Sequence, residues 1–439
     1  MAIVKAIKNS VSFFRWFINH RKNTCFFLLF ILLFTSCDLL RSRPNVDELS
    51  RHLDVRSIQD MFLFEDNSVQ IKIEHTQIID IDTDSYVDVV RYVPLETKDN
   101  VLIGNIDKLF FYENRIFVVD MFKSKSVFIF NDEGQFINKI SRFGYKIDEY
   151  RSFRDVELDK KTKQLVLYDR NGGKMLFFDL DGEFIRTQRL SFRFLNFKIF
   201  PNGNYLFYVD TYANDFNQEI AGQSLIIGHP QGKIYFRGLP FCSFLYDLNF
   251  YAKFGLAIND CSNDYEYISP RLSNAIYHVE STGELKKLYQ IHLPLGCMEE
   301  YMQHINPMHF VEEISNTEYY FSIGDRVLIN DFMFYFYFLN SVRKINEIWY
   351  NRTTGKYYCI RNKFSLSGKI INVPMPLYSY NDNLIGAIDA SQVVKSKTSF
   401  LEAHRTENNK DLFPEYMLEK IEAMTEDDNP LLMFYKIKW

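Results

Sequence analysis

The sequence QLVLYDRNGGKMLFFDLDGEFIR, residues Gln164–Arg186, predicts three short antiparallel strands. Three apolar runs, Gln164–Asp169, Lys174–Asp179 and Glu183–Arg186, are joined by tight polar turns. The turns contain Asn-Gly-Gly and Asp-Gly, which supply the positive φ angles that hairpins require. The stretch is therefore expected to form a meander.

Two parts of this stretch recur along the chain. A polar turn ending in glycine, followed by a new apolar run, occurs at Gly134, Gly182, Gly232, Gly283 and Gly355. An apolar run that ends in aspartate occurs at Asp120, Asp169, Asp210, Asp260, Asp331 and Asp389. Units of four strands that repeat every ~40–50 residues are typical of propeller blades. The six aspartate-ended runs predict an all-β protein, a six-bladed β-propeller with short helical insertions.

The blades can be placed along the chain. Blades 1 to 5 are predicted at Asn105–Ile140, Phe153–Leu190, Leu195–Arg237, Tyr246–Leu293 and Tyr319–Ile360. Blade 6 is predicted to combine Lys369–Pro376, Asn383–Asp389, Leu431–Lys438 and Val87–Pro94. The N-terminal strand near 87–94 would close the ring against 431–438, because an open ring leaves sheet edges exposed. The propeller is expected over residues 68–439, with helices within Gly296–Glu312 and Phe413–Met424.

The N-terminus predicts export. Basic residues ending at His20-Arg21-Lys22 precede ten apolar residues, Cys25–Phe34. Ten residues span about 15 Å as a helix, half of a bilayer core of about 30 Å, so residues 1–36 are expected to be a signal peptide. Thr35-Ser36-Cys37 resembles a bacterial lipobox, in which Cys37 is lipidated and anchors the protein to a membrane. The alternative is an ordinary signal peptide that contains a cysteine.

The predicted location follows from these features. Residues 37–67 are expected to be a tether with a helical patch at Val46–Met61, which holds the propeller at the periplasmic side of the outer membrane. The net charge is −5, and residues 1–36 contribute five basic residues and no acid, so the remaining chain carries −10. An acidic body argues against a nucleic-acid partner.

Several segments in order resemble a known family. They are YVPLETKDNVLIG (92–104), NRIFVVD (114–120), FNDEGQF (130–136), SRFGYKIDEYRSFRDVELD (141–159) and EDDNPLLMFYKIK (426–438). Together they look like the exported six-bladed β-propeller lipoproteins of Gram-negative bacteria, which are related to NHL-repeat and TolB-like propellers. The resemblance spans about residues 87–439 and implies an envelope propeller without an assigned activity. The family's Gly-Pro-Gly-Glu-Tyr-like loop reads GYKIDEY here, and only Gly144 and Glu149-Tyr150 are kept.

The loop between blades 1 and 2 is the candidate ligand site. Propellers bind on the face where their loops converge, and this loop carries Arg142, Tyr145, Lys146, Asp148, Glu149, Tyr150, Arg151 and Arg154. Aromatic rings combined with arginine and carboxylates suit sugars or peptides. The competing interpretation is a solvated loop with Tyr150 packed between the blades.

No catalytic residue, metal site or cofactor is predicted. Asp80, Asp82, Asp84 and Asp88 alternate as in a calcium loop, but Ser85 and Arg91 stand where an EF-hand needs Gly and Glu. An edge strand with outward polar residues is therefore favoured. Cys242, Cys261, Cys297 and Cys359 lack C-x-x-C spacing, and free thiols are favoured over a Cys242–Cys261 disulfide. The aspartates that end blade strands are expected to cap turns.

Two functions remain after these exclusions. The favoured one is a non-catalytic binding or scaffolding propeller that recognises an envelope glycan, a peptide or a partner protein. The alternative is an envelope hydrolase or lyase at the axial pocket, with or without a divalent cation. The enzyme hypothesis requires Asp148 or Glu149 to converge with a His or a Tyr.

Overall fold

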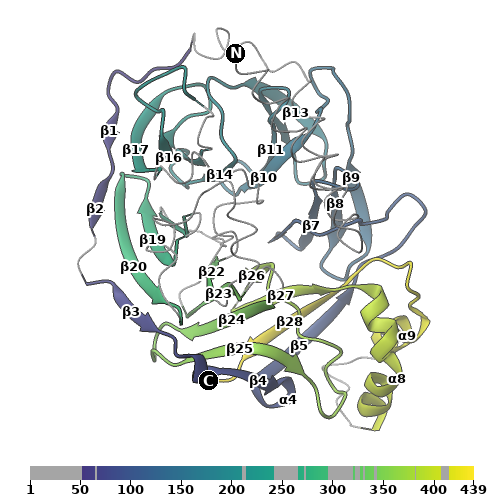
Figure 1. Ribbon diagram of the computed structural model, residues 1–439. Helices are drawn as coiled ribbons and strands as arrows, with labels where there is room; N and C mark the ends of the chain where they lie inside the picture. Colours follow the sequence, from purple (N-terminus) through teal and green to yellow (C-terminus); the bar gives the residue numbers. More distant parts are fainter. Residues whose placement is uncertain are drawn as a thin grey trace, which may run out of the picture. The chain divides into compact units, whose positions relative to one another are not determined.

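The computed structural model in Figure 1 describes residues 52–64, 67–209, 214–241, 265–270, 273–294, 320–321, 327–329, 332–340, 344–380, 382–406 and 415–439. Residues 46–439 form one compact unit. The predicted signal peptide, Cys37, Cys242, Cys261, Cys297 and the helical segment expected at Gly296–Glu312 lie outside the described residues.

The strands of this unit group into six sheets, which are the blades of a β-propeller (Figure 1). Blade 1 contains β6 (Lys108–Tyr112), β7 (Arg115–Asp120), β8 (Ser126–Asn131) and β9 (Phe136–Ile140). Blade 2 contains β10 (Phe153–Asp159), β11 (Gln164–Asp169), β12 (Lys174–Phe178) and β13 (Phe184–Arg189). Blade 3 contains β14 (Asn196–Ile199), β15 (Tyr205–Tyr208), β16 (Gln223–Gly228) and β17 (Ile234–Pro240). The prediction of an all-β six-bladed propeller is confirmed.

The second half of the ring is less regular. Blade 4 contains β18 (Tyr265–Ile268), β19 (Ala275–Glu280) and β20 (Glu284–His292). Blade 5 contains β21 (Tyr320–Phe321), β22 (Val327–Ile329), β23 (Met333–Asn340), β24 (Lys344–Asn351) and β25 (Tyr357–Phe364). Blade 6 contains β26 (Tyr378–Tyr380), β27 (Asn383–Ile388), β28 (Leu431–Ile437) and β5 (Val87–Pro94). In this last sheet β5 pairs antiparallel with β28, with Pro94 opposite Leu431.

The apolar core lies between the faces of neighbouring blades. One cluster joins blades 6, 1 and 2, and four further clusters lie between blades 2 and 3, 3 and 4, 4 and 5, and 5 and 6. Aromatic rings fill these interfaces, as where Phe111 of blade 1 stacks on Tyr378 of blade 6 at 5.8 Å. Flat rings suit this position because they cover wide areas of a pleated surface.

An N-terminal segment, described over residues 54–64 and 67–82, runs along the outer edges of three blades and is called the belt here. β1 (Gln59–Asp60) pairs parallel with β17 of blade 3. β2 (Phe62–Phe64) and β3 (Val69–Lys72) pair parallel with β20 of blade 4, and β4 (Ile78–Asp82) pairs parallel with β25 of blade 5. Figure 1 shows β1, β2 and β3 following one another along the outside of blades 3 and 4. The prediction of a helical patch at Val46–Met61 is therefore wrong for the described residues 52–61. Main-chain groups of this segment form hydrogen bonds to the edges of blades instead of the repeating hydrogen bonds of a helix.

Two other expectations need correction. The first strand of blade 6 was expected at Lys369–Pro376, but the structure has it at Tyr378–Tyr380, since residues 369–376 contain two prolines and form no strand. The helix expected within Phe413–Met424 is α9 (Glu415–Ala423), whereas α8 (Ala390–Thr406) has no counterpart among the helices expected from the sequence. Val393 and Phe400 of α8 are buried beside the 5–6 interface. In the part of the chain that is described, no helix is long and apolar enough to cross a membrane.

Candidate functional site

Charged side chains meet on the first strands of blades 1, 2 and 3. Lys108 of β6 donates to Asp155 of β10 at 2.9 Å and also to Glu157 of β10. Lys198 of β14 forms an ion pair with the same Glu157 at 3.0 Å. All four side chains are buried. We call these four residues the axial cluster, because β10 lies against β14 at the inner side of the blades (Figure 1).

The electrostatics of the axial cluster hold its members in place. Burial raises the pKa of Asp155 above its usual value, against the opposing effect of Lys108. For Lys198, burial would lower the pKa, but Glu157 and Glu266 outweigh it and the pKa is raised. Asp155 also accepts the Phe197 N–H at 3.0 Å. Each ammonium is thus held by carboxylates, so the cluster joins three blades rather than presenting a free nucleophile.

Sequence reasoning missed the axial cluster. The signal is a charged residue at the start of an apolar strand, as Lys108 in KLFFY, or within a strand, as Lys198 in NFKI and the two acids of Asp155-Val156-Glu157. Charges are rarely buried without a partner, so a lysine in one blade and a carboxylate in the next predict a pair between them.

The loop between blades 1 and 2, residues 142–151, is fixed by its own polar groups. Arg142 pairs with Asp148 at 2.8 Å, and the Glu149 carboxylate accepts the Lys146 N–H at 3.0 Å. This backbone hydrogen bond lowers the pKa of Glu149 below its usual value. The enzyme hypothesis requires one of these acids to converge with a His or a Tyr, but in the described part of the chain their side chains contact Arg142 and Lys146 instead.

The same loop is anchored to blade 2. The Lys174 ammonium donates to the carbonyls of Lys146 at 2.8 Å and Ile147 at 3.1 Å. The Thr187 hydroxyl donates to the Ile147 carbonyl at 2.6 Å. Because these bonds come from strands β12 and β13, the outer part of the loop is held on the sheet rather than hanging free.

Apolar side chains point outward from this anchored loop. Phe143, Tyr145 and Ile147 are exposed by 57%, 85% and 73%. Lys125 lies 5.0 Å from the centre of the Phe143 ring, and Arg151 lies 5.7 Å from the centre of the Tyr145 ring. The loop therefore presents three alternating apolar side chains beside two cations, and we call these three side chains the loop surface.

Two of the residues proposed as ligand contacts have other surroundings. Tyr150 is fully buried, and its hydroxyl donates to the Lys125 carbonyl at 2.5 Å and accepts the Arg142 N–H at 3.2 Å. Burial raises the pKa of Tyr150. Its observed place corrects the prediction of ligand contact and matches the competing interpretation, a ring packed between blades. Arg154 lies on strand β10, outside the loop, and its side chain is half-buried.

The strand-ending aspartates cap turns where the structure describes them. Asp120 accepts the N–H groups of Gly104 and Lys123, each at 2.9 Å. Asp169 accepts those of Arg151 at 3.1 Å and Gly172 at 3.0 Å. The capping role is confirmed for these two residues.

The alternating aspartates near the start of the propeller serve different strands. Asp80 accepts the Asn362 amide at 3.0 Å, Asp82 accepts the Asp84 N–H at 3.3 Å at the start of α4 (Thr83–Tyr86), and Asp84 accepts the Ser365 hydroxyl at 2.9 Å. No group of three or more His, Cys, Asp or Glu that could hold a metal occurs among the described residues.

Cys359 is a buried free thiol, and burial raises its pKa to about 12.

Comparison with known proteins gives the family. The family described as "Domain of unknown function (DUF4934)" matches residues 67–436. The chain belongs to this family. No curated protein matches this DUF4934 chain.

Solved structures show the same fold. A protein of Bacteroides fragilis NCTC 9343 that is provisionally described as exported is 16% identical, with a TM-score of 0.61 over 85% of this chain and 100% of that chain. A catalytically inactive virginiamycin B lyase of Staphylococcus aureus is 11% identical, with a TM-score of 0.34 over 65% of this chain and 79% of that chain. The first likeness shows the propeller fold alone, and the second, at this TM-score, carries no argument.

Proposed function

We propose that this protein is a non-catalytic binding propeller of the cell envelope that docks a partner protein through the loop surface of Phe143, Tyr145 and Ile147. The observation that carries the proposal is the exposure of these three side chains on a loop anchored to blade 2. Exposed apolar residues that cluster on an ordered surface are typical of protein interfaces.

Anchoring favours binding. A loop already held in one conformation loses little conformational freedom when a partner docks, so more of the contact energy remains as affinity. Lys125 and Arg151 beside the rings add positive charge to a protein whose net charge is −5. Such a local reversal of sign steers an acidic partner toward this surface.

A protein partner is favoured over a glycan. Sugars stack on aromatic rings whose surroundings supply hydrogen-bonding groups. The loop surface offers Phe143 and Tyr145 as rings, but the exposed aliphatic side chain of Ile147 gives a sugar no polar contact. A protein or peptide can cover all three side chains with its own apolar residues.

Location in the envelope rests on the N-terminus. The lipobox-like Thr35-Ser36-Cys37 supports membrane attachment through a lipid on Cys37, and the provisionally exported relative agrees with export. Labelling of cells with a fatty-acid analogue tests the anchor. Label is expected on the protein and not on Cys37→Ala, and equal labelling of both would contradict it.

Copurification with variants tests docking. The protein, Ile147→Ser and Ile185→Ser are purified from gently solubilised envelopes. Ile185 is 44% exposed on β13, so it provides the same substitution at a matched site outside the loop. A discrete partner is expected with the unchanged protein and Ile185→Ser and is expected to be lost with Ile147→Ser. Retention by Ile147→Ser would contradict the proposal.

A further inference from the structure

The belt does not cover the edge of blade 5 along its whole length. On blades 3 and 4 the belt starts its contact at the turn glycine, since Asp54 N–H donates to the Gly232 carbonyl at 2.8 Å and Phe62 N–H donates to the Gly283 carbonyl at 3.0 Å. On blade 5 the corresponding glycine is Gly355, but pairing begins four residues later, with Cys359 opposite Ile78. Between these points the belt forms a short 3₁₀ turn, η1 (His75–Gln77).

This turn uses the main-chain groups that would otherwise continue the ladder. Gln77 N–H donates to the Glu74 carbonyl at 2.9 Å, and Ile78 N–H donates to the His75 carbonyl. The Gln77 side chain closes the turn by accepting the Glu74 N–H at 2.7 Å. The belt is therefore folded back on itself beside residues 355–358 of blade 5.

Tyr357 of β25 is left with an open edge. Asn351 N–H donates to the Lys356 carbonyl, so Lys356 and Tyr358 direct their main-chain groups to β24. Because these directions alternate along a strand, the N–H and C=O of Tyr357 point to the belt side. The ladder there would use Gln77 N–H and the His75 carbonyl, but within η1 Gln77 N–H donates to the Glu74 carbonyl and the His75 carbonyl accepts Ile78 N–H.

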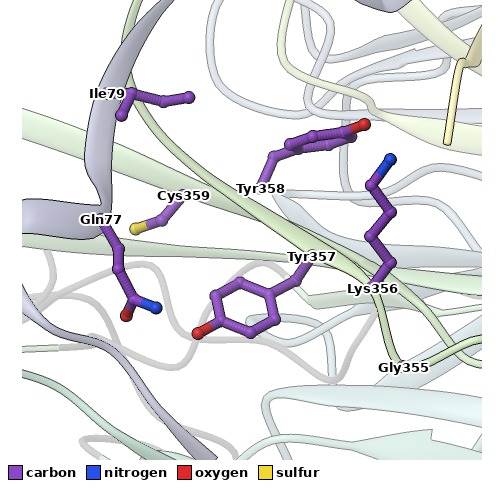
Figure 2. A pocket seen from close by; sticks show the side chains of 7 residues that line it. All are labelled: Gln77, Ile79, Gly355, Lys356, Tyr357, Tyr358 and Cys359. Atoms are coloured by element: carbon purple, nitrogen blue, oxygen red, sulfur yellow. The ribbon is translucent and has the colours of Figure 1, made fainter.

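A pocket opens at this gap. Its volume is about 380 Å³, and it is lined by Gln77, Ile79, Gly355, Lys356, Tyr357, Tyr358 and Cys359. Figure 2 shows Gln77 and Ile79 coming from the belt on one side and residues 355–359 from β25 and its turn on the other. A volume of this size accommodates a small ligand of a few residues.

The side chains of the pocket suit an anion with apolar parts. The Lys356 ammonium lies 5.1 Å from the centre of the Tyr358 ring and has no carboxylate partner among the described residues. No acidic residue lines the pocket. The Gln77 amide nitrogen also has no partner in the part of the chain that the structure describes, while Ile79 and the two rings are apolar walls.

We infer that this pocket binds a short, extended peptide that carries a carboxylate. The peptide main chain pairs with the open N–H and C=O of Tyr357, as β4 of the belt does with β25 from Cys359 onward. The carboxylate of the peptide lies at Lys356. Addition of an extended peptide to a free strand edge is a common recognition mode, in which the main chain gives affinity and nearby pockets give specificity. This site is separate in sequence from the loop surface and goes beyond the docking proposed there.

Titration calorimetry of the intact protein tests the inference. The probes are acetyl-Ala-Val-Ala-Glu with a free C-terminus and acetyl-Ala-Val-Ala-Gln amide, which has the same length without charge. Binding of the acidic peptide is expected to be at least tenfold tighter than that of the amide. Lys356→Gln is expected to remove this difference, whereas Lys161→Gln, the same change at an exposed turn of blade 2, is expected to keep it.

Two further measurements keep the outcome decisive. Trp439 stacks on Tyr358 at 5.6 Å, so its fluorescence is expected to change when the acidic peptide binds and to stay constant with Lys356→Gln. A uronic-acid disaccharide is the competing probe. Binding of the disaccharide without the peptide, no binding of the peptide at millimolar concentration, or peptide binding that Lys356→Gln leaves unchanged would each overturn the inference.

Discussion

Glu157 is the residue on which the inner side of blades 1, 2 and 3 depends. It holds Lys108 and Lys198 from the two flanking blades, and all three side chains are buried. Removing the charge of one partner in a buried ionic group leaves the other charges uncompensated. This costs far more stability than replacing the whole group with apolar residues. The axial cluster therefore stabilises this packing without being evidence of catalysis.

Glu157→Gln is expected to lower the free energy of unfolding by about 3–5 kcal/mol. Glu113→Gln is the matched control, because Glu113 pairs with Lys163 at 2.6 Å in an exposed position and is expected to change stability by less than ~1 kcal/mol. Denaturant unfolding of both variants measures the difference. Equal stabilities would contradict a buried ionic role for Glu157.

Cys359 gives a second prediction at the same scale. Its thiol is buried and burial raises its pKa to about 12, so about one thiol in 10⁴ is ionised at pH 8. Iodoacetamide is expected to alkylate Cys359 at least 10³-fold more slowly in the native protein than in urea, as followed by mass spectrometry of its peptide. Because the raised pKa favours the neutral thiol, the rate is expected to rise with pH up to about 12. Fast native alkylation at pH 8 would contradict the burial of the Cys359 thiol.

Individual residues differ in how well the sequence predicts them. The roles of Asp120 and Asp169 follow from a local pattern, because a strand end and its turn are adjacent in sequence. The contacts of Lys108 do not, since its partners lie 47 and 49 residues away. Of the loop surface, the sequence singled out Tyr145 but not Phe143 or Ile147. The burial of Tyr150 and the exposure of Ile147 depend on how the loop rests on blade 2.

Turn glycines set the distance between neighbouring elements. An added Cβ at Gly283 would lie 2.5 Å from the Phe236 ring of blade 3, and the backbone there has φ of +89°. At Gly203 φ is similar, +91°, but nothing lies within 4 Å of the added carbon. The two positions therefore separate the strain of a left-handed backbone from the need for close packing.

Gly203→Ala is expected to cost about 1 kcal/mol of stability, from backbone strain alone. Gly283→Ala is expected to cost at least ~1 kcal/mol more, because Phe236 and the adjoining strand must move. Denaturant midpoints of the two variants measure the difference. If both variants lose the same stability, the contact between blades 3 and 4 does not require glycine at position 283.

Elements with local patterns were predicted well, and the belt was not. The strands of blades 1 to 3 follow from alternating turns and apolar runs, which is local information. The belt strands are two to five residues long and pair in parallel with β17, β20 and β25, so their partners lie more than 170 residues away. Short parallel pairs with distant partners leave no period in the sequence.

At the scale of the whole propeller, N-terminal segments complete four consecutive blades. The belt adds outer strands to blades 3, 4 and 5, and β5 supplies the outer strand of blade 6. Blades 1 and 2 are four-stranded, and the loop surface lies between them. The sequence predicts the number of blades because the strand and turn pattern recurs along the chain. A binding surface has no such recurring pattern, and the loop surface is recognised only by the exposure and anchoring that the structure shows.

Crosslinking in intact cells tests the central claim, that the loop surface docks a protein partner. A photoreactive phenylalanine analogue is placed at position 145 or, as control, at position 416, where Tyr416 is 60% exposed on α9. Docking predicts a discrete crosslinked protein from position 145 that is absent from position 416 and is lost when Ile147→Ser is added. No crosslink from position 145, or the same products from both positions, would contradict it.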